Sequence, residues 1–199
     1  MSQLDEWRGE FGKAYTDRNI VEWQKREPAF REMTGGLSLS RVLEIRCNRG
    51  HNLVALSNVP GEDTELVGLE PNPYAREFAR GNSKIGILNG TTYEIPFKDG
   101  YFDLVFTCTV LIHVPLEKLP VAMREISRVS RRYILCIEYF AEQETTIHYR
   151  GHDDLLWKRN FLEEYQRHVP GLNLLRTGYW DDKNGFDRSH WWLLEKSRI

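Results

Sequence analysis

The sequence has little cysteine, no long apolar run and no excess of basic residues. Its three cysteines, Cys47, Cys108 and Cys136, are widely spaced among 199 residues and form no CxxC or Cys/His zinc pattern, so we expect free thiols in a reducing cytosol and no metal site. No apolar run approaches the roughly 20 residues that a membrane helix needs, and the charged N-terminus lacks the apolar core of a signal peptide. The formal net charge of −2 provides no basic field for nucleic acid. These absences favour a single cytoplasmic domain, residues 1–199, with neither a membrane nor a nucleic acid as its partner.

A strand, a tight turn and a helix follow one another between residues 41 and 56. Arg41–Ile45 is typical of a short buried strand, Gly50 falls in the turn, and His51–Leu56 is typical of the first turns of a helix. A second strand, Glu65–Leu69, ends in Glu70, and an acid in this place can accept hydrogen bonds from ribose hydroxyls. This order predicts a nucleotide-binding βαβ unit, with backbone N–H groups at the start of the helix facing the ligand.

The rest of the chain alternates between helical and strand patterns. The spacing of Trp7, Phe11, Ala14 and Tyr15 predicts a helix, and a second one is expected from about Ile20 to Met33. The later expectations are helices at 74–80, 116–129 and 155–168, strands at 84–88, 102–106, 133–137, 172–178 and 191–196, and a polar loop at 139–153. This alternation indicates an α/β fold with a mostly parallel sheet.

Two segments resemble a known family. The run VLEIRCNRGHNL followed by LVGLEPNPYA is similar to the first two motifs of class I S-adenosyl-L-methionine (SAM)-dependent methyltransferases, although the three glycine places hold Arg46, Asn48 and Gly50. The run NGTTYEIPF resembles the segment that borders the adenine, and Phe102-Asp103 matches the start of the fourth strand. The resemblance implies a Rossmann-like sheet of seven strands that an antiparallel hairpin closes. Residues 1–36 are either a helical lid over the cofactor, as in this family, or two helices that pack on the edge of the core.

The same resemblance implies which residues form the site. Glu44 should anchor the methionine amino end of SAM, Glu70 the ribose, and Thr91 and Thr92 the adenine. The further cofactor residues expected are Arg46, Asn48, Gly50, Pro71, Thr107 and Tyr15. His113 follows the fourth strand, where it is either a base or ligand contact or a structural histidine. The residues expected at the methyl acceptor are Arg18, Asn19, His148, Tyr149 and Arg150, unless the last three belong to a solvated loop.

A closer resemblance concerns the acceptor. The segments WRGEFGKAYTDRN, VLIHVPLEKL and HYRGHDDLLWKRNF together look like the small methylases associated with pseudaminic-acid and related surface-sugar biosynthesis. This similarity implies methyl transfer to an oxygen or nitrogen of a sugar or sugar nucleotide.

Two other functions stay open. One is a non-catalytic ligand-binding or partner-binding member of the same fold, which the arginine at position 46 suggests. The other is a nicotinamide-dependent oxidoreductase, which the glycine spacing disfavours. Arg46 either points out of the pocket and weakens SAM binding, or binds a carboxylate or phosphate beside the site.

Overall fold

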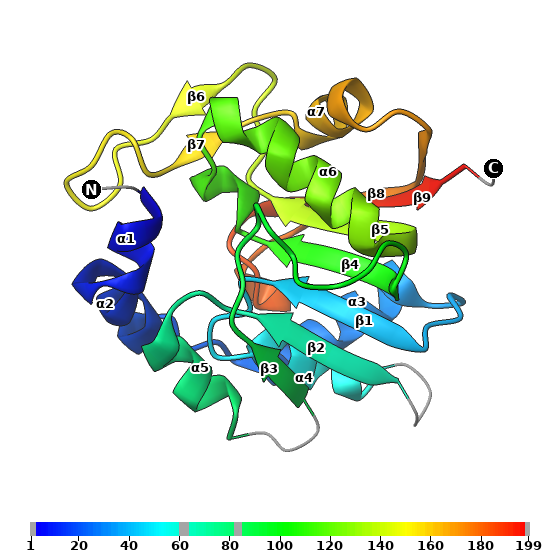
Figure 1. Ribbon diagram of the computed structural model, residues 1–199, viewed down its shortest axis with the longest axis horizontal. Coiled ribbons are helices and arrows are strands. Elements are labelled where there is room, and N and C mark those ends of the chain that lie inside the picture. The colour runs from blue at the N-terminus through cyan, green and yellow to red at the C-terminus, as the bar shows by residue number, and fades with distance from the viewer. Residues whose placement is uncertain (1–2, 60–63, 82–84, 198–199) are drawn as a thin grey trace.

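The strand and helix patterns along the chain assemble into three layers, seen here in a computed structural model that describes residues 3–59, 64–81 and 85–197 (Figure 1). A seven-stranded sheet in the order β3-β2-β1-β4-β5-β9-β8 forms the middle layer. The first five strands are parallel, and β9 is antiparallel to both of its neighbours. The strands are β1 (Arg41–Ile45), β2 (Glu65–Leu69), β3 (Ile85–Leu88), β4 (Phe102–Cys108), β5 (Ser130–Glu138), β8 (Leu172–Trp180) and β9 (Ser189–Lys196).

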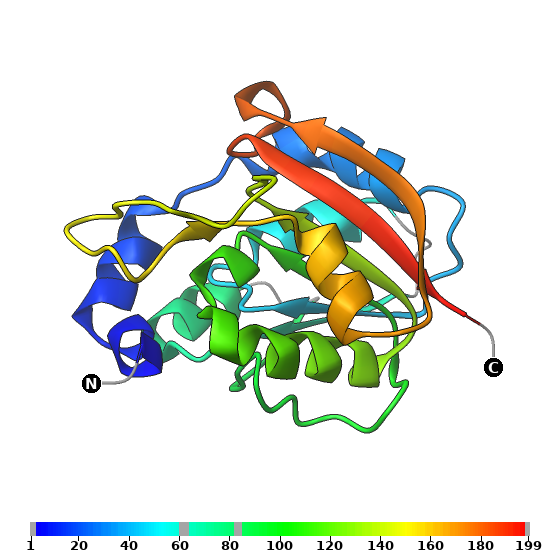
Figure 2. The same cartoon turned by 90° about the horizontal axis from the view of Figure 1, so that it is seen from above.

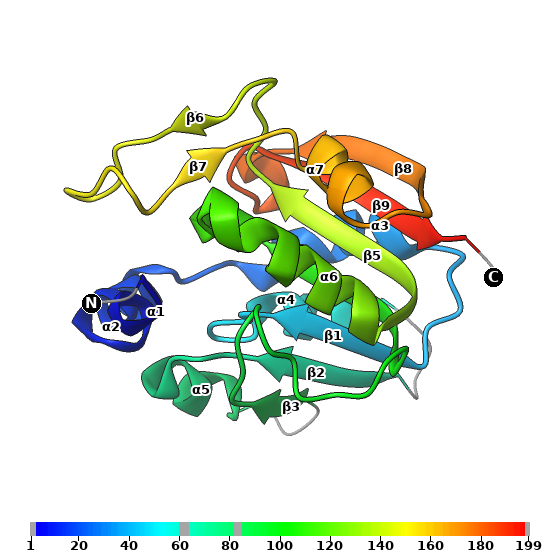
Figure 3. The ribbon, with the colours of Figure 1, turned by 45° about the horizontal axis from the view of Figure 1, so that its top comes forward.

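Helices cover both faces of the sheet, which explains why its central strands are almost continuously apolar. On one face α6 (Leu119–Val129) and α7 (Phe161–His168) bury their apolar sides in a core that includes Leu43, Val105 and Ile134. On the other face α3 (Glu27–Thr34), α4 (His51–Ser57) and α5 (Pro73–Ala79) pack on a second core (Figure 3). The predicted α/β fold, its seven-stranded sheet and its antiparallel closing hairpin are confirmed.

The N-terminal segment differs from its prediction. The first helix is interrupted at Gly9 and forms α1 (Gln3–Arg8) and α2 (Glu10–Arg18). The second helix was expected from Ile20, but α3 begins only at Glu27, after the 3₁₀ helix η1 (Trp23–Arg26). Pro28 explains this start, because proline is tolerated in the first turn of an α-helix and breaks its interior.

The segment 139–160 is also more ordered than expected. β6 (Thr145–Thr146), inside the predicted polar loop, pairs with β7 (Trp157–Lys158), inside the predicted helix, and the two form a small hairpin. The prediction of a helix from Leu155 is wrong, because α7 begins at Phe161, where the Asn160 side chain accepts a hydrogen bond from the Glu163 N–H. Figure 2 shows this hairpin and the N-terminal helices at the same end of the molecule.

Smaller differences concern element ends. Three short 3₁₀ helices occur later in the chain, η2 (Leu111–His113), η3 (Leu116–Lys118) and η4 (Asp182–Asn184). The predicted strand start at Lys84 lies outside the described residues. Within the described ranges, none of the helices combines the length and the apolar character that crossing a bilayer requires.

Candidate active site

The loop between β1 and α4 keeps the backbone of a glycine-rich motif without most of its glycines. Arg46, Asn48 and Gly50 have φ angles of 55°, 47° and 75°, all in the left-handed region. Asparagine tolerates this region, whereas for most residues with a Cβ it costs about 1–2 kcal/mol. The backbone N–H of Asn48 donates to Glu70 Oε2 over 2.9 Å and so fastens the turn to the end of β2. The fold thus imposes the left-handed backbone conformation at positions 46 and 48, although neither residue is glycine.

Two acids lie at the ends of the neighbouring strands β1 and β2. Glu44 is 2% exposed, its Oε1 accepts from Asn52 Nδ2 over 2.7 Å, and its Oε2 has no partner among the described residues. Burial raises the pKa of Glu44 to about 8. Glu70 accepts from the N–H groups of Asn48 and Asn72, and burial raises its pKa while Arg46 opposes that rise. Each carboxylate still has lone pairs for a ligand.

Arg46 lies in the wall of the site. Its guanidinium carbon is 4.8 Å from the centre of the Trp7 ring, and no acid of the described residues lies within ion-pair distance of it. Burial lowers the pKa of Arg46, and Glu70 raises it. The alternative in which this side chain points out of the pocket is therefore wrong, because Trp7 of α1 holds it at the cavity.

His113 is buried and has a defined tautomer. Its Nδ1 lies 2.5 Å from the carbonyl oxygen of Leu155, which can only accept, so Nδ1 carries the proton and Nε2 keeps a lone pair. Burial lowers the pKa of His113 to about 3, so the ring is neutral at physiological pH. The ring centre lies 4.6 Å from that of Trp7 and 5.6 Å from that of Tyr149.

A single carboxylate positions the turn that carries His113. Glu138, at the end of β5, is fully buried and accepts hydrogen bonds from three successive backbone N–H groups, those of residues 110, 111 and 112, over 3.1, 3.1 and 3.3 Å. Burial raises the pKa of Glu138 to about 7, against the effect of these donors. The turn after β4 is thus attached to the next strand of the sheet.

These residues surround a cavity of about 360 Å³ at the carboxyl ends of the strands. The predicted site residues that line it are Tyr15, Arg18, Asn19, Glu44, Arg46, Asn48, Glu70, His113, Tyr149 and Arg150. Pro71, Thr91 and Thr92 line a second hollow of only about 10 Å³ instead. Trp7 and Arg46 border both hollows, so their side chains separate the acid-lined cavity from the residues expected at the adenine.

Three predicted residues do not reach either hollow. Gly50 begins α4 behind the loop, Thr107 is buried inside β4, and the exposed His148 pairs with Asp153. Sequence reasoning also missed several lining residues, Trp7, Arg26, Asn52, Tyr139, Phe186, Asp187 and Ser189. Over the described ranges, no group of three or more histidine, cysteine, aspartate or glutamate side chains is arranged to hold a metal ion.

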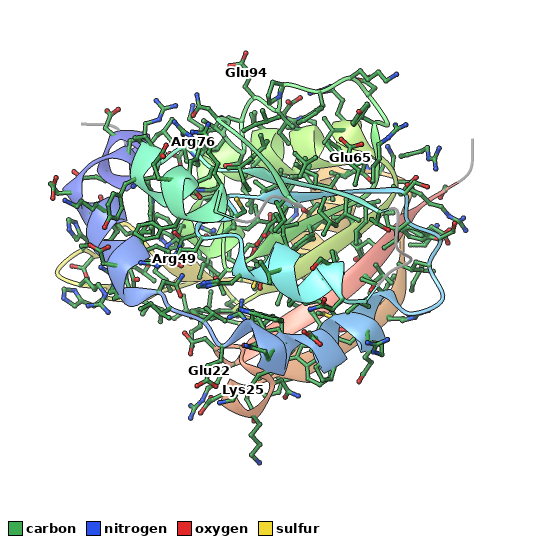
Figure 4. All side chains as sticks on the ribbon, turned by 90° about the horizontal axis from the view of Figure 1, so that it is seen from below. Glu22, Lys25, Arg49, Glu65, Arg76 and Glu94 are labelled. Atoms are coloured by element: carbon green, nitrogen blue, oxygen red, sulfur yellow. The ribbon has the colours of Figure 1, made fainter. Side chains whose placement is uncertain are left out.

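The N-terminal helices are fastened over the cavity. Asn72 Nδ2 donates to the Trp7 carbonyl over 2.9 Å, and Arg49 Nε donates to the Thr16 carbonyl over 2.8 Å. Arg49, labelled in Figure 4, also lies within ion-pair distance of Asp17. A side chain at Gly12 would collide with this arrangement, since a Cβ there would lie 1.9 Å from the Trp7 carbonyl oxygen. The helices and the motif loop therefore form one packed unit.

The sheet order and the loop after β1 identify the fold. The chain has the fold of the class I SAM-dependent methyltransferases. Residues 43–134 match the sequence model of a family described as a methyltransferase domain.

Comparisons with individual proteins agree. An uncharacterized Haemophilus influenzae protein is 32% identical over 48% of this chain and 40% of its own length. The demethylmenaquinone methyltransferase of Bacillus licheniformis is 29% identical over 63% of this chain and 58% of its own length. The structure of Burkholderia thailandensis 1,6-didemethyltoxoflavin-N1-methyltransferase with bound 1,6-didemethyltoxoflavin and S-adenosylhomocysteine gives a TM-score of 0.75 at 13% identity, over 100% of this chain and 92% of that one. The chain thus spans about half the length of these curated relatives, and the structural likeness concerns the fold.

Proposed function

We propose that this protein is a SAM-dependent methyltransferase that transfers a methyl group to an oxygen or nitrogen of a small molecule. The observation that carries the proposal is the pair Glu44 and Glu70, which end adjacent parallel strands and face one cavity beside the motif loop. The methyltransferase domain match over residues 43–134 and the S-adenosylhomocysteine in the toxoflavin enzyme support it.

The buried polar groups fit this cofactor. The unpartnered Oε2 of Glu44 can accept from an ammonium group, and Glu70 has lone pairs left for two hydroxyls. Pro71, Thr91 and Thr92 would border the adenine, which requires the second hollow to widen. SAM supplies an already activated methyl group, so the protein's task is alignment and the exclusion of water.

Residues on three segments would bind and orient the methyl acceptor. Nε2 of His113 can accept a hydrogen bond from the O–H or N–H that is methylated, and its neutral state at physiological pH suits that role. The low pKa of His113 limits it as a proton acceptor until a bound ligand changes its surroundings. Tyr15 and Tyr149 line the same cavity and supply further polar groups.

The finer proposal is that the acceptor is a sugar or sugar nucleotide of surface-polysaccharide biosynthesis. The three segments that resemble surface-sugar methylases, 7–19, 110–119 and 148–161, meet at the cavity, where His113 contacts both Trp7 and Tyr149. We further propose one domain over 1–199, with 1–36 as the lid and a cytoplasmic location, which the free cysteines support.

Calorimetry with SAM, S-adenosylhomocysteine and NAD tests the activity class. The expected result is binding of the first two ligands and no measurable binding of NAD, with both affinities lowered in Glu70→Gln. Binding of NAD alone would overturn the proposal in favour of an oxidoreductase. Binding of SAM without consumption of it, in the presence of a panel of sugar nucleotides, would favour a non-catalytic member of the fold.

A further inference from the structure

The cavity holds more positive than negative charge, although the whole chain has a net charge of −2. Five arginines line it, Arg18, Arg26, Arg46, Arg49 and Arg150, together with three acids, Glu44, Glu70 and Asp187. Because burial raises the pKa of Glu44 to about 8, that carboxyl is mainly neutral at pH 7 in the unliganded protein. At most three carboxylates therefore face five guanidinium groups.

Two of the five arginines have structural partners. Arg26 Nε donates to the Gly185 carbonyl over 2.7 Å, and another nitrogen of Arg26 donates to the Asn52 side chain. Arg49 bonds the Thr16 carbonyl and lies near Asp17. Both arginines connect elements that surround the cavity, and these bonds account for their presence.

The other three, Arg18, Arg46 and Arg150, have no acid within ion-pair distance in the part of the chain that the structure describes. Each is held over an aromatic ring instead. The guanidinium carbon of Arg18 lies 5.3 Å from the ring centre of Tyr15, that of Arg46 4.8 Å from Trp7, and that of Arg150 5.8 Å from Tyr149. Stacking on a ring leaves the N–H edge of a guanidinium free to donate.

The rings belong to one cluster. Trp7 contacts Tyr15 and His113 at centre distances of 5.2 and 4.6 Å, and His113 contacts Tyr149 at 5.6 Å. Arg46 and Arg150 also have φ angles of 55° and 53°, which a residue with a side chain rarely adopts. Three arginines from three distant segments thus converge on one wall, two of them at some cost in backbone strain.

We infer that the acceptor is an anion, a small molecule with a carboxylate or phosphate group that Arg46, Arg18 and Arg150 bind. The inference rests on the proposed function and adds the charge of the substrate to it. SAM carries a net positive charge, so its entry into a cavity with surplus guanidinium groups is unfavourable unless an anion accompanies it. A planar guanidinium donates two parallel hydrogen bonds to either oxyanion, which makes it suited to both.

The experiment uses the full chain saturated with S-adenosylhomocysteine. Calorimetry measures the binding of phenyl phosphate, of benzoate and of neutral benzyl alcohol, which share one ring and differ in the charged group. The variants are Arg46→Gln, Arg18→Gln and Arg150→Gln, and the control is Arg167→Gln, whose exposed side chain on α7 pairs with Glu164.

At least one of the two anions is expected to bind more tightly than benzyl alcohol. The anion that binds more tightly shows whether the site prefers a phosphate or a carboxylate. Arg46→Gln should weaken that binding by about tenfold or more, since it removes hydrogen bonds to a charged group. Arg18→Gln and Arg150→Gln lie at exposed positions, should fold normally and should weaken binding by less, while Arg167→Gln changes nothing.

Three results would overturn the inference: anions that bind no better than the alcohol, full anion affinity in all three variants, or a parallel loss of cofactor affinity in Arg46→Gln. The last would make Arg46 a ligand of the cofactor's own carboxylate. Failure of the wild-type protein to bind S-adenosylhomocysteine refutes the proposed function instead, and the anion titrations then apply to the free protein.

Discussion

Replacement of Arg46 by glycine keeps the left-handed backbone conformation of the motif loop and removes the positive charge of its side chain. The substitution restores the residue type that a φ of 55° favours and removes a guanidinium held 4.8 Å from the Trp7 ring centre. It also removes one of the two side chains, those of Arg46 and Trp7, that border both hollows. We therefore expect opposite effects on the cofactor and on the anion probes.

The effect on stability is small because three contributions nearly cancel. Relief of the left-handed strain adds about 1–2 kcal/mol to the free energy of unfolding. The loss of the contact with Trp7 removes up to about 2 kcal/mol, and the extra freedom of glycine in the unfolded chain removes about 0.5–1 kcal/mol. We expect the unfolding free energy of Arg46→Gly to lie within about 1 kcal/mol of the wild-type value, which urea titration measures.

The effect on SAM is larger. Two like charges about 8–16 Å apart repel by about 1–2 kcal/mol at an effective dielectric constant of about 20. Removal of the guanidinium should therefore tighten SAM binding by about 5- to 30-fold. S-adenosylhomocysteine lacks the sulfonium charge, so its affinity should rise less, and calorimetry on both ligands gives the ratio.

Asn48→Gly is the matched control, because residue 48 has a similar φ of 47° but carries no charge. It should leave the ratio of SAM to S-adenosylhomocysteine affinity unchanged. Weaker SAM binding by a folded Arg46→Gly protein would refute the reasoning, since it would show that the arginine contacts the cofactor directly.

Three further predictions concern the acid, the histidine and the lid. Glu70→Gln should weaken SAM binding by about 1.5–3 kcal/mol, and an unchanged dissociation constant would remove the ribose assignment. Glutamine is preferred to alanine there because its one side-chain oxygen can keep one of the two backbone N–H bonds that Glu70 accepts. Because the pKa of His113 falls to about 3 on folding, the free energy of unfolding decreases as the pH drops from 6.5 towards 3. At pH 5 the wild type should therefore lose about 2 kcal/mol relative to His113→Gln. Equal losses of the two proteins in urea titrations would contradict this. His113→Gln should also lower turnover more than SAM affinity. Hydrogen exchange over residues 15–19 should slow when S-adenosylhomocysteine binds, and unchanged protection would rule out the lid.

Sequence patterns were sufficient for the sheet and for the acids. β1 and β2 lie at the predicted residues because buried parallel strands are short apolar runs, and the acids Glu44 and Glu70 lie within β1 near its end and directly after β2. Asn72 caps α5 as predicted, with its side chain accepting from the Tyr74 N–H. These features depend on local order along the chain, which a sequence displays directly.

Contacts between distant segments were not predictable in this way. The helical spacing marks Trp7 as apolar, but nothing in it indicates that the ring lies between Arg46 and His113. Phe186 and Asp187 reach the cavity from the connection between β8 and β9, which carries no motif. The direction of the Arg46 side chain is likewise decided by its partner on α1, about forty residues away in the sequence.

The bond between Arg26 and the Gly185 carbonyl sets the order in which the cavity can form during synthesis. Arg26 precedes the first strand and also lies 4.5 Å from the centre of the Phe186 ring, so the wall they build joins the segment before β1 to the connection between β8 and β9. The motif loop, both acids and His113 all emerge from the ribosome while β9 is still unmade. The wall that Arg26 builds with Gly185 and Phe186 can therefore close only after residues 185 and 186 have been synthesised.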